Sequence, residues 1–335
     1  MKSAGGFSTG KIRPFSGPVG GITNKLKTVN KMEIPQLGFA TYCLKPAVAE
    51  EAVSFALQCG YRHFDCASVY GNQYEVGKAL RKGAKSYGRE NIFISSKLWA
   101  TDQHPDHVEG ACRDTLRELG LDYLDLYYIH WPSCWRRRAS SPVDLFPVTA
   151  EGLPDVDETV TLLDTYKAVC GLIDKGLIRG IGLCHCDLAQ VQSVVGQVPG
   201  DAHHPAVCQL ELHPALPTPP VVEYLSEEGI LPAALCPLRE LGTTPFVTND
   251  VIAGLSRLTG YSTERLVLNW NLDNVRITLA GSPQKEHIKQ NAKAALFTME
   301  DSVRAILKLY HEKGGVAHRP SICPSGFPRK GECIF

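Results

Sequence analysis

The sequence predicts an α/β fold, a (β/α)8 TIM barrel with a short N-terminal hairpin and a C-terminal extension. Eight short apolar runs each precede a helix-like segment, and this alternation is typical of parallel strands with helices outside them. The chain has 335 residues, which suits a single barrel. A doubly wound open sheet is the alternative, but no Gly-x-Gly-x-x-Gly motif follows the first strand, and eight repeats favour closure.

The composition limits the classes of partner. With 35 basic and 35 acidic residues the formal net charge is zero, so nothing draws the whole chain to nucleic acid or to an anionic membrane. No apolar run approaches the ~20 residues that a spanning helix needs, and the N-terminus lacks the apolar centre of a signal peptide. We therefore expect no nucleic-acid partner and no membrane, and the sequence does not indicate an oligomeric state.

The 12 cysteines bear on the compartment and on metal binding. They are scattered without Cys-x-x-Cys pairing, which is typical of reduced thiols in the cytoplasm. One close pair, Cys184 and Cys186, flanks His185, but a zinc site would need two further ligands that the spacing does not supply. We expect a cytoplasmic protein with no metal site.

Two terminal segments fall outside the predicted barrel. Residues 1–25 are rich in Gly and Ser and contain no acidic residue, which predicts a disordered extension. Organelle transit peptides are also basic and acid-free, but they usually carry more Arg and an amphipathic helix. The expected order is the extension 1–25, the barrel 26–315 and an irregular tail 316–335. This tail and a long polar connection, 133–157, could both fold over the mouth of the barrel.

The predicted elements begin with a hairpin whose turn lies at Asn30 and Lys31. The predicted strands are 36–40, 61–64, 92–96, 123–129, 178–183, 207–210, 230–235 and 276–279. The predicted helices are 47–58, 74–82, 105–119, 159–175, 188–195, 219–228 and 263–271, and a segment 286–295 follows the last strand. Pro105 suits the first turn of its helix, where a missing N–H does no harm. Glycines, which helix ends favour, follow four of the helices at positions 60, 120, 176 and 229.

Side chains that can carry chemistry stand at the ends of successive strands. Asp65 follows the second barrel strand, and Tyr70 lies on the loop behind it. Lys97 ends the third strand, and His130 ends the fourth. Because the carboxyl ends of parallel strands meet at one mouth of a barrel, an acid, a phenol, an ammonium and an imidazole can converge there.

This set favours proton transfer from the phenol. A tyrosine titrates near pH 10 in water, too high for an efficient acid at neutral pH. Lys97 is expected to lower the pKa of Tyr70, while Asp65 keeps the lysine charged and in place. His130 can orient a substrate oxygen by a hydrogen bond. The set holds no evident nucleophile or metal cluster, which leaves protonation of an oxygen as its carbon receives a hydride from a nicotinamide or flavin.

The same stretches resemble the signatures of the aldo-keto reductase family. The matching segments are 60–72, 94–99, 119–132, 180–182 and 209–214. The resemblance covers residues 26 to 312 and implies a (β/α)8 barrel without a Rossmann fold. It also implies reversible NAD(P)H-dependent reduction of aldehydes and ketones.

The resemblance assigns the catalytic roles. By it, Tyr70 is the proton donor, Lys97 and Asp65 tune that donor, and His130 orients the carbonyl of a small-molecule substrate. Candidate walls of the substrate pocket are Tyr42, Trp99 and Trp131, although Tyr42 and Trp99 are equally well explained as packing residues. The sequence does not identify the substrate.

The cofactor shell departs from the family pattern. Where the family usually has Ser-Asn to hold the nicotinamide carboxamide, this chain has Cys184 and His185, and the third partner, Gln209, is present. Leu235 stands where an aromatic residue usually stacks on the nicotinamide. Near the last strand, Gly281 and His287 replace the lysine and arginine that usually grip the 2′-phosphate of NADPH. The candidate cofactor contacts are Asp65, Cys184, His185, Gln209, Leu235, Ser282, His287, Gln290 and Asn291.

These departures leave three outcomes open. Lys and Arg make the strong phosphate contacts, so their loss weakens the case for NADPH, which the resemblance nevertheless implies as the cofactor. NADPH could still bind with lower affinity through residues such as Lys285 or Lys289, or NADH could replace it. The third outcome is a catalytically weakened binding or regulatory protein with an impaired cofactor site. A barrel of another class, such as a metal-dependent hydrolase, would require bound metal.

Overall fold

The computed structural model describes residues 22, 24–138, 144–198, 200–216, 218–238 and 250–313. The predicted extension 1–25, apart from residues 22, 24 and 25, lies outside this part of the chain, as does the predicted tail 316–335.

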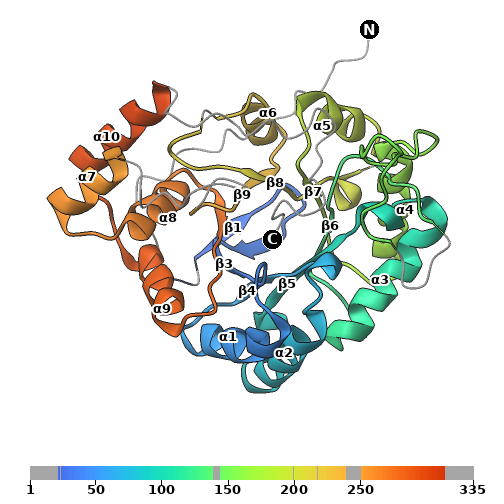
Figure 1. The fold of residues 1–335 in the computed structure, drawn as a ribbon, viewed down its shortest axis with the longest axis horizontal. Helices are drawn as coiled ribbons and strands as arrows, with labels where there is room; N and C mark the ends of the chain where they lie inside the picture. Colours follow the sequence, from blue (N-terminus) through green and yellow to red (C-terminus); the bar gives the residue numbers. More distant parts are fainter. Residues whose placement is uncertain are drawn as a thin grey trace, which may run out of the picture.

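Eight parallel strands close into a barrel (Figure 1). They are β3 (Leu37–Ala40), β4 (His63–Asp65), β5 (Phe93–Leu98), β6 (Leu126–Ile129), β7 (Ile181–Cys184), β8 (Val207–Glu211), β9 (Leu231–Leu235) and β10 (Ile277–Leu279). Each strand pairs with the next in chain order, and β10 pairs with β3 to complete the circle. The barrel prediction is therefore confirmed, and the open sheet is excluded.

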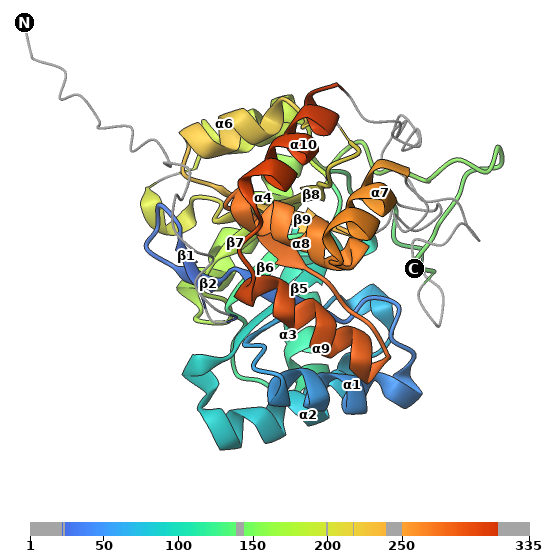
Figure 2. The same cartoon turned by 90° about the vertical axis from the view of Figure 1, so that its left-hand side faces the viewer.

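The predicted hairpin is also confirmed. It consists of β1 (Lys25–Lys27) and β2 (Glu33–Pro35), which pair antiparallel, and Lys31 in its turn adopts a left-handed φ of 63°. Ile34 packs in one buried cluster with Phe93 and Leu126, the first residues of β5 and β6. The hairpin therefore covers the N-terminal end of the barrel (Figure 2) and leaves the opposite end for chemistry.

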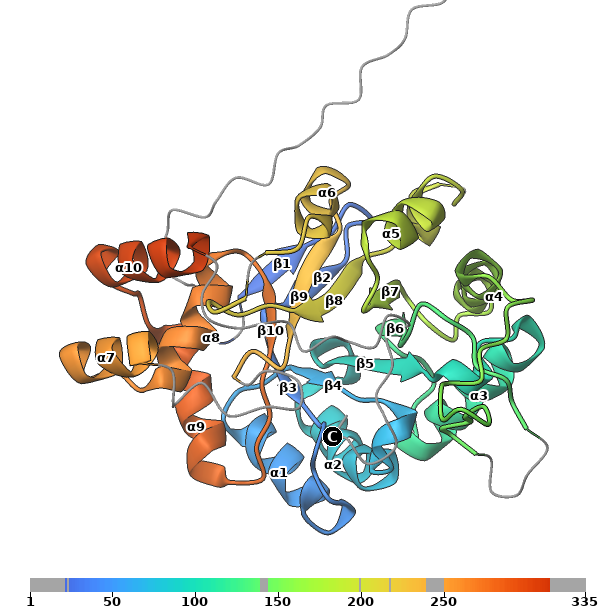
Figure 3. The same ribbon diagram turned by 45° about the horizontal axis from the view of Figure 1, so that its top comes forward.

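Ten α-helices of the described residues lie outside the strands (Figure 3). They are α1 (Pro46–Gln58), α2 (Gln73–Tyr87), α3 (Pro105–Leu119), α4 (Leu162–Asp174), α5 (Leu188–Val195), α6 (Val221–Glu227), α7 (Asp250–Thr259), α8 (Thr263–Asp273), α9 (Lys285–Lys293) and α10 (Asp301–Glu312). In α3, Val108, Cys112 and Leu116 recur every four residues and are buried, because one helix face packs on the barrel. All four glycines predicted to follow helices have positive φ.

Helix starts explain where the predicted bounds were wrong. The predicted helix 159–175 begins only at Leu162, because the Thr161 side chain accepts a hydrogen bond from the Asp164 backbone N–H and the Asp164 carboxylate accepts one from the Thr161 backbone N–H. Such a capping box fixes the residue before it as the non-helical N-cap.

Two helices, α7 and α10, were missing from the predicted elements. Both pack against α8, where Ile252 of α7 and Val303 and Leu307 of α10 join Trp270 in a buried cluster. This layer lies outside the regular ring of one helix per strand, so the barrel repeat does not predict it. Within the described residues, no helix is both long enough and apolar enough to cross a membrane.

Candidate active site

The C-terminal ends of β4, β5 and β6 bring the predicted catalytic residues together. Asp65 is the last residue of β4 and lies in register with Ser95 of β5. Lys97 shares the face of Ser95, because alternate residues of a strand point the same way. His130 follows the last residue of β6, and Tyr70 ends a short 3-10 helix, Ser68–Tyr70.

Lys97 makes hydrogen bonds to two of the other predicted catalytic residues, Asp65 and Tyr70. Its ammonium has no exposed surface, and it donates to Asp65 Oδ2 at 2.5 Å, to the Cys66 carbonyl at 2.9 Å and to Tyr70 Oη at 3.1 Å. The other carboxylate oxygen, Asp65 Oδ1, accepts from Ser95 Oγ at 2.8 Å. An ammonium has three donors and no acceptor, so all three are used, and the Tyr70 hydroxyl hydrogen points away from Lys97.

The pKa of Tyr70 differs from the expectation. Burial raises the pKa of the phenol well above its ordinary value, and the Asp65 carboxylate raises it further. The net shift in the resting protein is therefore opposite to the predicted lowering by Lys97, because burial is its largest cause. The phenol consequently holds its proton at neutral pH, as a proton donor must.

His130 lies beside the phenol. The centroids of the Tyr70 and His130 rings are 6.1 Å apart, and the Trp99 ring stands edge-on to His130 at 5.2 Å. Burial lowers the pKa of His130 well below its ordinary value, and Lys97 lowers it further, so the imidazole is neutral and offers one N–H. Its Nδ1 atom is buried and finds no hydrogen-bond partner within the described residues.

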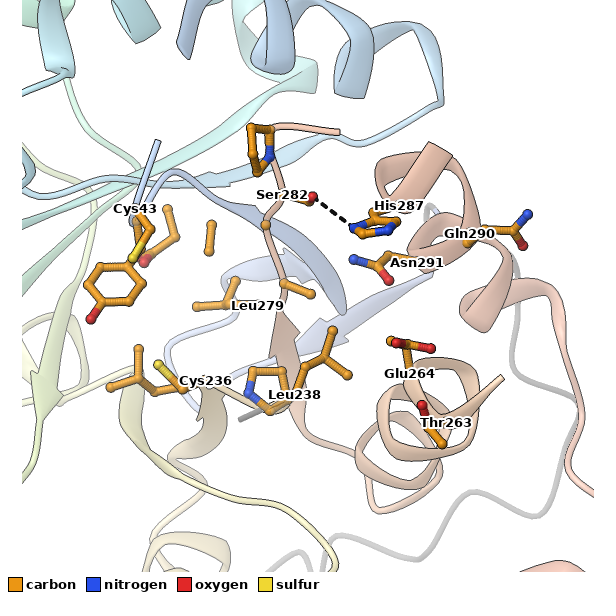
Figure 4. A pocket seen from close by; sticks show the side chains of 18 of the residues that line it. Cys43, Cys236, Leu238, Thr263, Glu264, Leu279, Ser282, His287, Gln290 and Asn291 are labelled. Carbon is orange, nitrogen blue, oxygen red and sulfur yellow. Dashed lines mark hydrogen bonds between the residues drawn. The ribbon is translucent and has the colours of Figure 1, made fainter. Parts of the chain in front are cut away.

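A cavity of about 410 Å³ runs from Tyr70 toward α8 and α9 (Figure 4). Eight residues predicted for catalysis, cofactor or substrate line it: Tyr42, Asp65, Tyr70, Leu235, Ser282, His287, Gln290 and Asn291. They come from the loop after β3, the ends of β4 and β9, the loops after β4 and β10, and α9. The structure thus joins the predicted proton donor and several of the predicted cofactor contacts in one cavity.

The three predicted carboxamide contacts are not part of this lining. Cys184 and Gln209 have no exposed surface, and Cys184 Sγ donates to Gln209 Oε1 at 3.4 Å. His185 stacks on Trp131, with ring centroids 4.1 Å apart and planes 9° from parallel. Gln209 Nε2 is buried and lacks a hydrogen-bond partner among the described residues.

The two predicted pocket tryptophans lie in a buried cluster. Trp99 is 1% exposed and donates its indole N–H to the Leu145 carbonyl at 2.8 Å. Trp135 and Phe146, both from the connection 133–157, pack on Trp99, so the described part of this connection lies beside the predicted catalytic residues. Trp99 and Trp131 are thus largely covered, whereas Tyr42 lines the cavity.

The cavity also has a wall that the sequence reasoning missed. Ser262, Thr263 and Glu264, at the start of α8, line it opposite α9. Ser-Thr-Glu is a readable helix start, and Ser262 Oγ indeed accepts from the Arg265 backbone N–H. Nothing in the sequence indicates, however, that this helix end faces the loop after the last strand.

The lysines named as substitute phosphate contacts do not reach the cavity lining. Lys285 forms an ion pair with Glu51 of α1 at 2.5 Å, and Lys289 is exposed on the same helix. Gly281 approaches the backbone of Ala40 so closely that a Cβ atom there would lie 1.9 Å from the Ala40 carbonyl oxygen. Only glycine fits this backbone.

Comparisons with known proteins agree on one family. The model of the aldo/keto reductase family matches residues 37–310. Aldo-keto reductase family 1 member A1 of Rattus norvegicus is 35% identical over 283 residues, which cover 82% of this chain and 84% of that protein. The aldose reductase structure from Schistosoma japonicum superposes with a TM-score of 0.79 at 33% identity, covering 91% of this chain and 97% of that one. The aldose reductase structure from Giardia lamblia gives the same TM-score at 28% identity, covering 88% and 97%.

Proposed function

The chain belongs to the aldo/keto reductase family, and we propose that it reduces aldehydes or ketones to alcohols with a reduced nicotinamide dinucleotide, using Tyr70 as the proton donor. The observation that carries this proposal is the contact of Lys97 with both Tyr70 Oη and Asp65 at one wall of the cavity. A purely structural ion pair would not need a phenol as its third neighbour.

The residues present fit a nicotinamide dinucleotide. The cavity extends from the phenol to α9. Gln209 lies outside the cavity lining, but its Nε2 is a buried donor without a partner in the described chain, as a contact to a carboxamide oxygen would require. Ser282, Gln290 and Asn291, which line the cavity, would hold the adenosine end. A bound reduced nicotinamide supplies the hydride.

The side chains then stabilise and neutralise the negative charge that develops on the carbonyl oxygen. His130 donates its single N–H to that oxygen and holds it near Tyr70, whose hydrogen already points away from Lys97. As the oxygen becomes an alkoxide, it takes the phenolic proton. The Lys97 ammonium, 3.1 Å from Tyr70 Oη, stabilises the phenolate that remains. The lysine therefore acts on the transition state, although burial keeps the resting phenol protonated.

The predicted cytoplasmic location stays a proposal. All ten cysteines in the described residues are free thiols, which is what a reducing compartment would maintain.

Equilibrium binding and turnover of the wild type test the proposal together. We expect calorimetry to detect binding of a reduced nicotinamide dinucleotide, and the same protein to oxidise it when 4-nitrobenzaldehyde is added. Binding without turnover of any of a panel of aldehydes and ketones would instead favour the regulatory alternative. Absence of binding at millimolar concentration would contradict the proposal outright.

A further inference from the structure

The described lining of the cavity contains acidic side chains but no lysine or arginine. The two acidic residues among the described residues that line it are Asp65 and Glu264. Asp65 is paired with Lys97 beside the phenol. The carboxylate of Glu264 lines the cavity and makes no ion pair and no hydrogen bond with the described residues, so none of these residues compensates its charge.

We propose that this cavity selects a dinucleotide whose adenosine ribose lacks a 2′-phosphate, so that NADH binds more tightly than NADPH, and that Glu264 sets this preference. The inference rests on the proposed function, because it assumes that a nicotinamide dinucleotide occupies the cavity. It reverses the cofactor that the family resemblance implies.

The position of Glu264 is the first argument. Figure 4 shows it on α8, facing Asn291 and His287 of α9, in the part of the cavity that lies away from Cys43. His287 is engaged with Ser282, whose Oγ lies 3.3 Å from His287 Nδ1. Ser282, His287 and Asn291 are the residues that would meet the adenosine ribose, and the carboxylate stands opposite them.

The second argument is that nearby cations are held elsewhere. Lys285 is paired with Glu51 at 2.5 Å, on the far side of α9. The Arg265 guanidinium, next to Glu264 in sequence, lies 4.0 Å from the centroid of the Phe297 ring and does not line the cavity. The described residues therefore offer no guanidinium or ammonium for a phosphate at this end.

The third argument is that the backbone excludes a replacement cation. A side chain at position 281 would collide with the Ala40 carbonyl, since even a Cβ would lie 1.9 Å from its oxygen. The loop after β10 therefore lies too close to the end of β3 for a lysine at position 281. A Gly281→Lys substitution alone would not restore the phosphate contact that the family usually has there.

NADH and NADPH differ in the group at the 2′ position of the adenosine ribose, and a carboxylate there would favour one and repel the other. A ribose 2′-hydroxyl can donate a hydrogen bond to a carboxylate, the same recognition that acidic residues provide for NAD in other folds. A 2′-phosphate carries about −1.5 to −2 charges at neutral pH and would meet the carboxylate with no lysine or arginine of the described cavity lining between them. A favourable contact with one ligand and repulsion of the other together give specificity.

Calorimetric titration of the full-length protein with NADH and with NADPH, at matched salt and pH 8, tests the inference without relying on turnover. We expect NADH to bind about 10- to 100-fold more tightly, the range that one charged hydrogen bond provides. Glu264→Gln keeps the shape of the side chain and should reduce this ratio about tenfold. Glu300→Gln removes the same charge from an exposed residue at the start of α10 and should leave the ratio unchanged.

The outcomes distinguish this inference from the proposed function. Equal or tighter binding of NADPH to the wild type would overturn the inference and leave the reductase proposal standing. A ratio unaffected by Glu264→Gln, in a variant with the circular dichroism spectrum of the wild type, would overturn the role of Glu264. Binding of neither dinucleotide would overturn both.

Discussion

At the residue scale, the Lys97 ammonium organises the site, because its three hydrogens are shared among Asp65, Tyr70 and the Cys66 carbonyl. Lys97 and Asp65 have almost no exposed surface, so each charge depends on the other. A buried ion pair of this kind adds little net stability, yet removing one partner leaves an uncompensated buried charge. Function, more than stability, explains why such a pair lies beside a phenol.

Substitutions of this pair separate the two effects. Lys97→Met leaves Asp65 buried and unpaired and should lower the free energy of unfolding by about 3–5 kcal/mol. The double variant Asp65→Asn/Lys97→Met should recover most of that loss, as measured by urea unfolding, while its turnover stays as low as that of Lys97→Met. Recovered turnover in the double variant would show that Lys97 does not act on the phenol.

The sequence identified the members of this site but not their electrostatics. Strand ends and loop positions were enough to place Asp65, Tyr70 and Lys97 at one mouth. The pKa direction of Tyr70 was wrong because a sequence shows which charges are near and not how deeply a group is buried. Glu264 was missed for a related reason, since its approach to the cavity depends on how α8 packs beside β10.

At the scale of elements, close helix packing depends on glycine. Gly77 of α2 packs against the end of α3, where a Cβ atom would lie 2.4 Å from the Leu119 carbonyl oxygen. A backbone oxygen cannot rotate out of the way as a side chain can. The contact between α2 and α3 therefore tolerates no side chain at this position.

Gly77→Ala should accordingly destabilise the protein by about 1–3 kcal/mol, the usual cost of overpacking. Gly110 of α3 is the matched control, because it is an exposed helical glycine whose added Cβ would meet nothing within 4 Å. Gly110→Ala should raise stability by roughly 0.5–1 kcal/mol, since alanine is the better helix former. Urea unfolding measures the change in stability of both variants. Equal changes would mean that α2 and α3 do not pack closely at Gly77.

The elements of the barrel were predictable because each obeys a local rule. Strands are short apolar runs, and helix ends carry proline or glycine, as at Pro105 and Gly120. The helices α7 and α10 were not predicted, because they bury Ile252, Val303 and Leu307 against α8 and not against the barrel. The strand–helix repeat predicts one helix after each strand, and so it does not predict a second layer of helices.

At the scale of the whole molecule, buried histidines link folding to pH. His63 of β4 has no exposed surface, and its Nδ1 lies 3.0 Å from the Pro35 carbonyl oxygen. Burial lowers the pKa of His63 to about 4 from its ordinary value of 6.5. Between these values the unfolded chain binds a proton that the folded protein does not, so stability falls as the pH falls through this window.

We therefore expect His63 alone to make the free energy of unfolding smaller by on the order of 3 kcal/mol at pH 4 than at pH 7. Below about pH 4 both states are protonated, so His63 adds no further loss. His63→Gln should show a correspondingly shallower decline in urea unfolding across this range. Identical pH profiles for the wild type and the variant would contradict this assignment.

The most direct test of the central claim compares two phenols near the same lysine. Tyr70 Oη accepts a hydrogen bond from Lys97, whereas the Tyr128 ring lies 5.8 Å from the Lys97 nitrogen and Tyr128 Oη has no hydrogen-bond partner in the described chain. Turnover of 4-nitrobenzaldehyde should fall at least about 100-fold in Tyr70→Phe, the usual worth of a general acid, with dinucleotide binding retained. Tyr128→Phe should turn over like the wild type. Undiminished turnover in Tyr70→Phe would contradict the account.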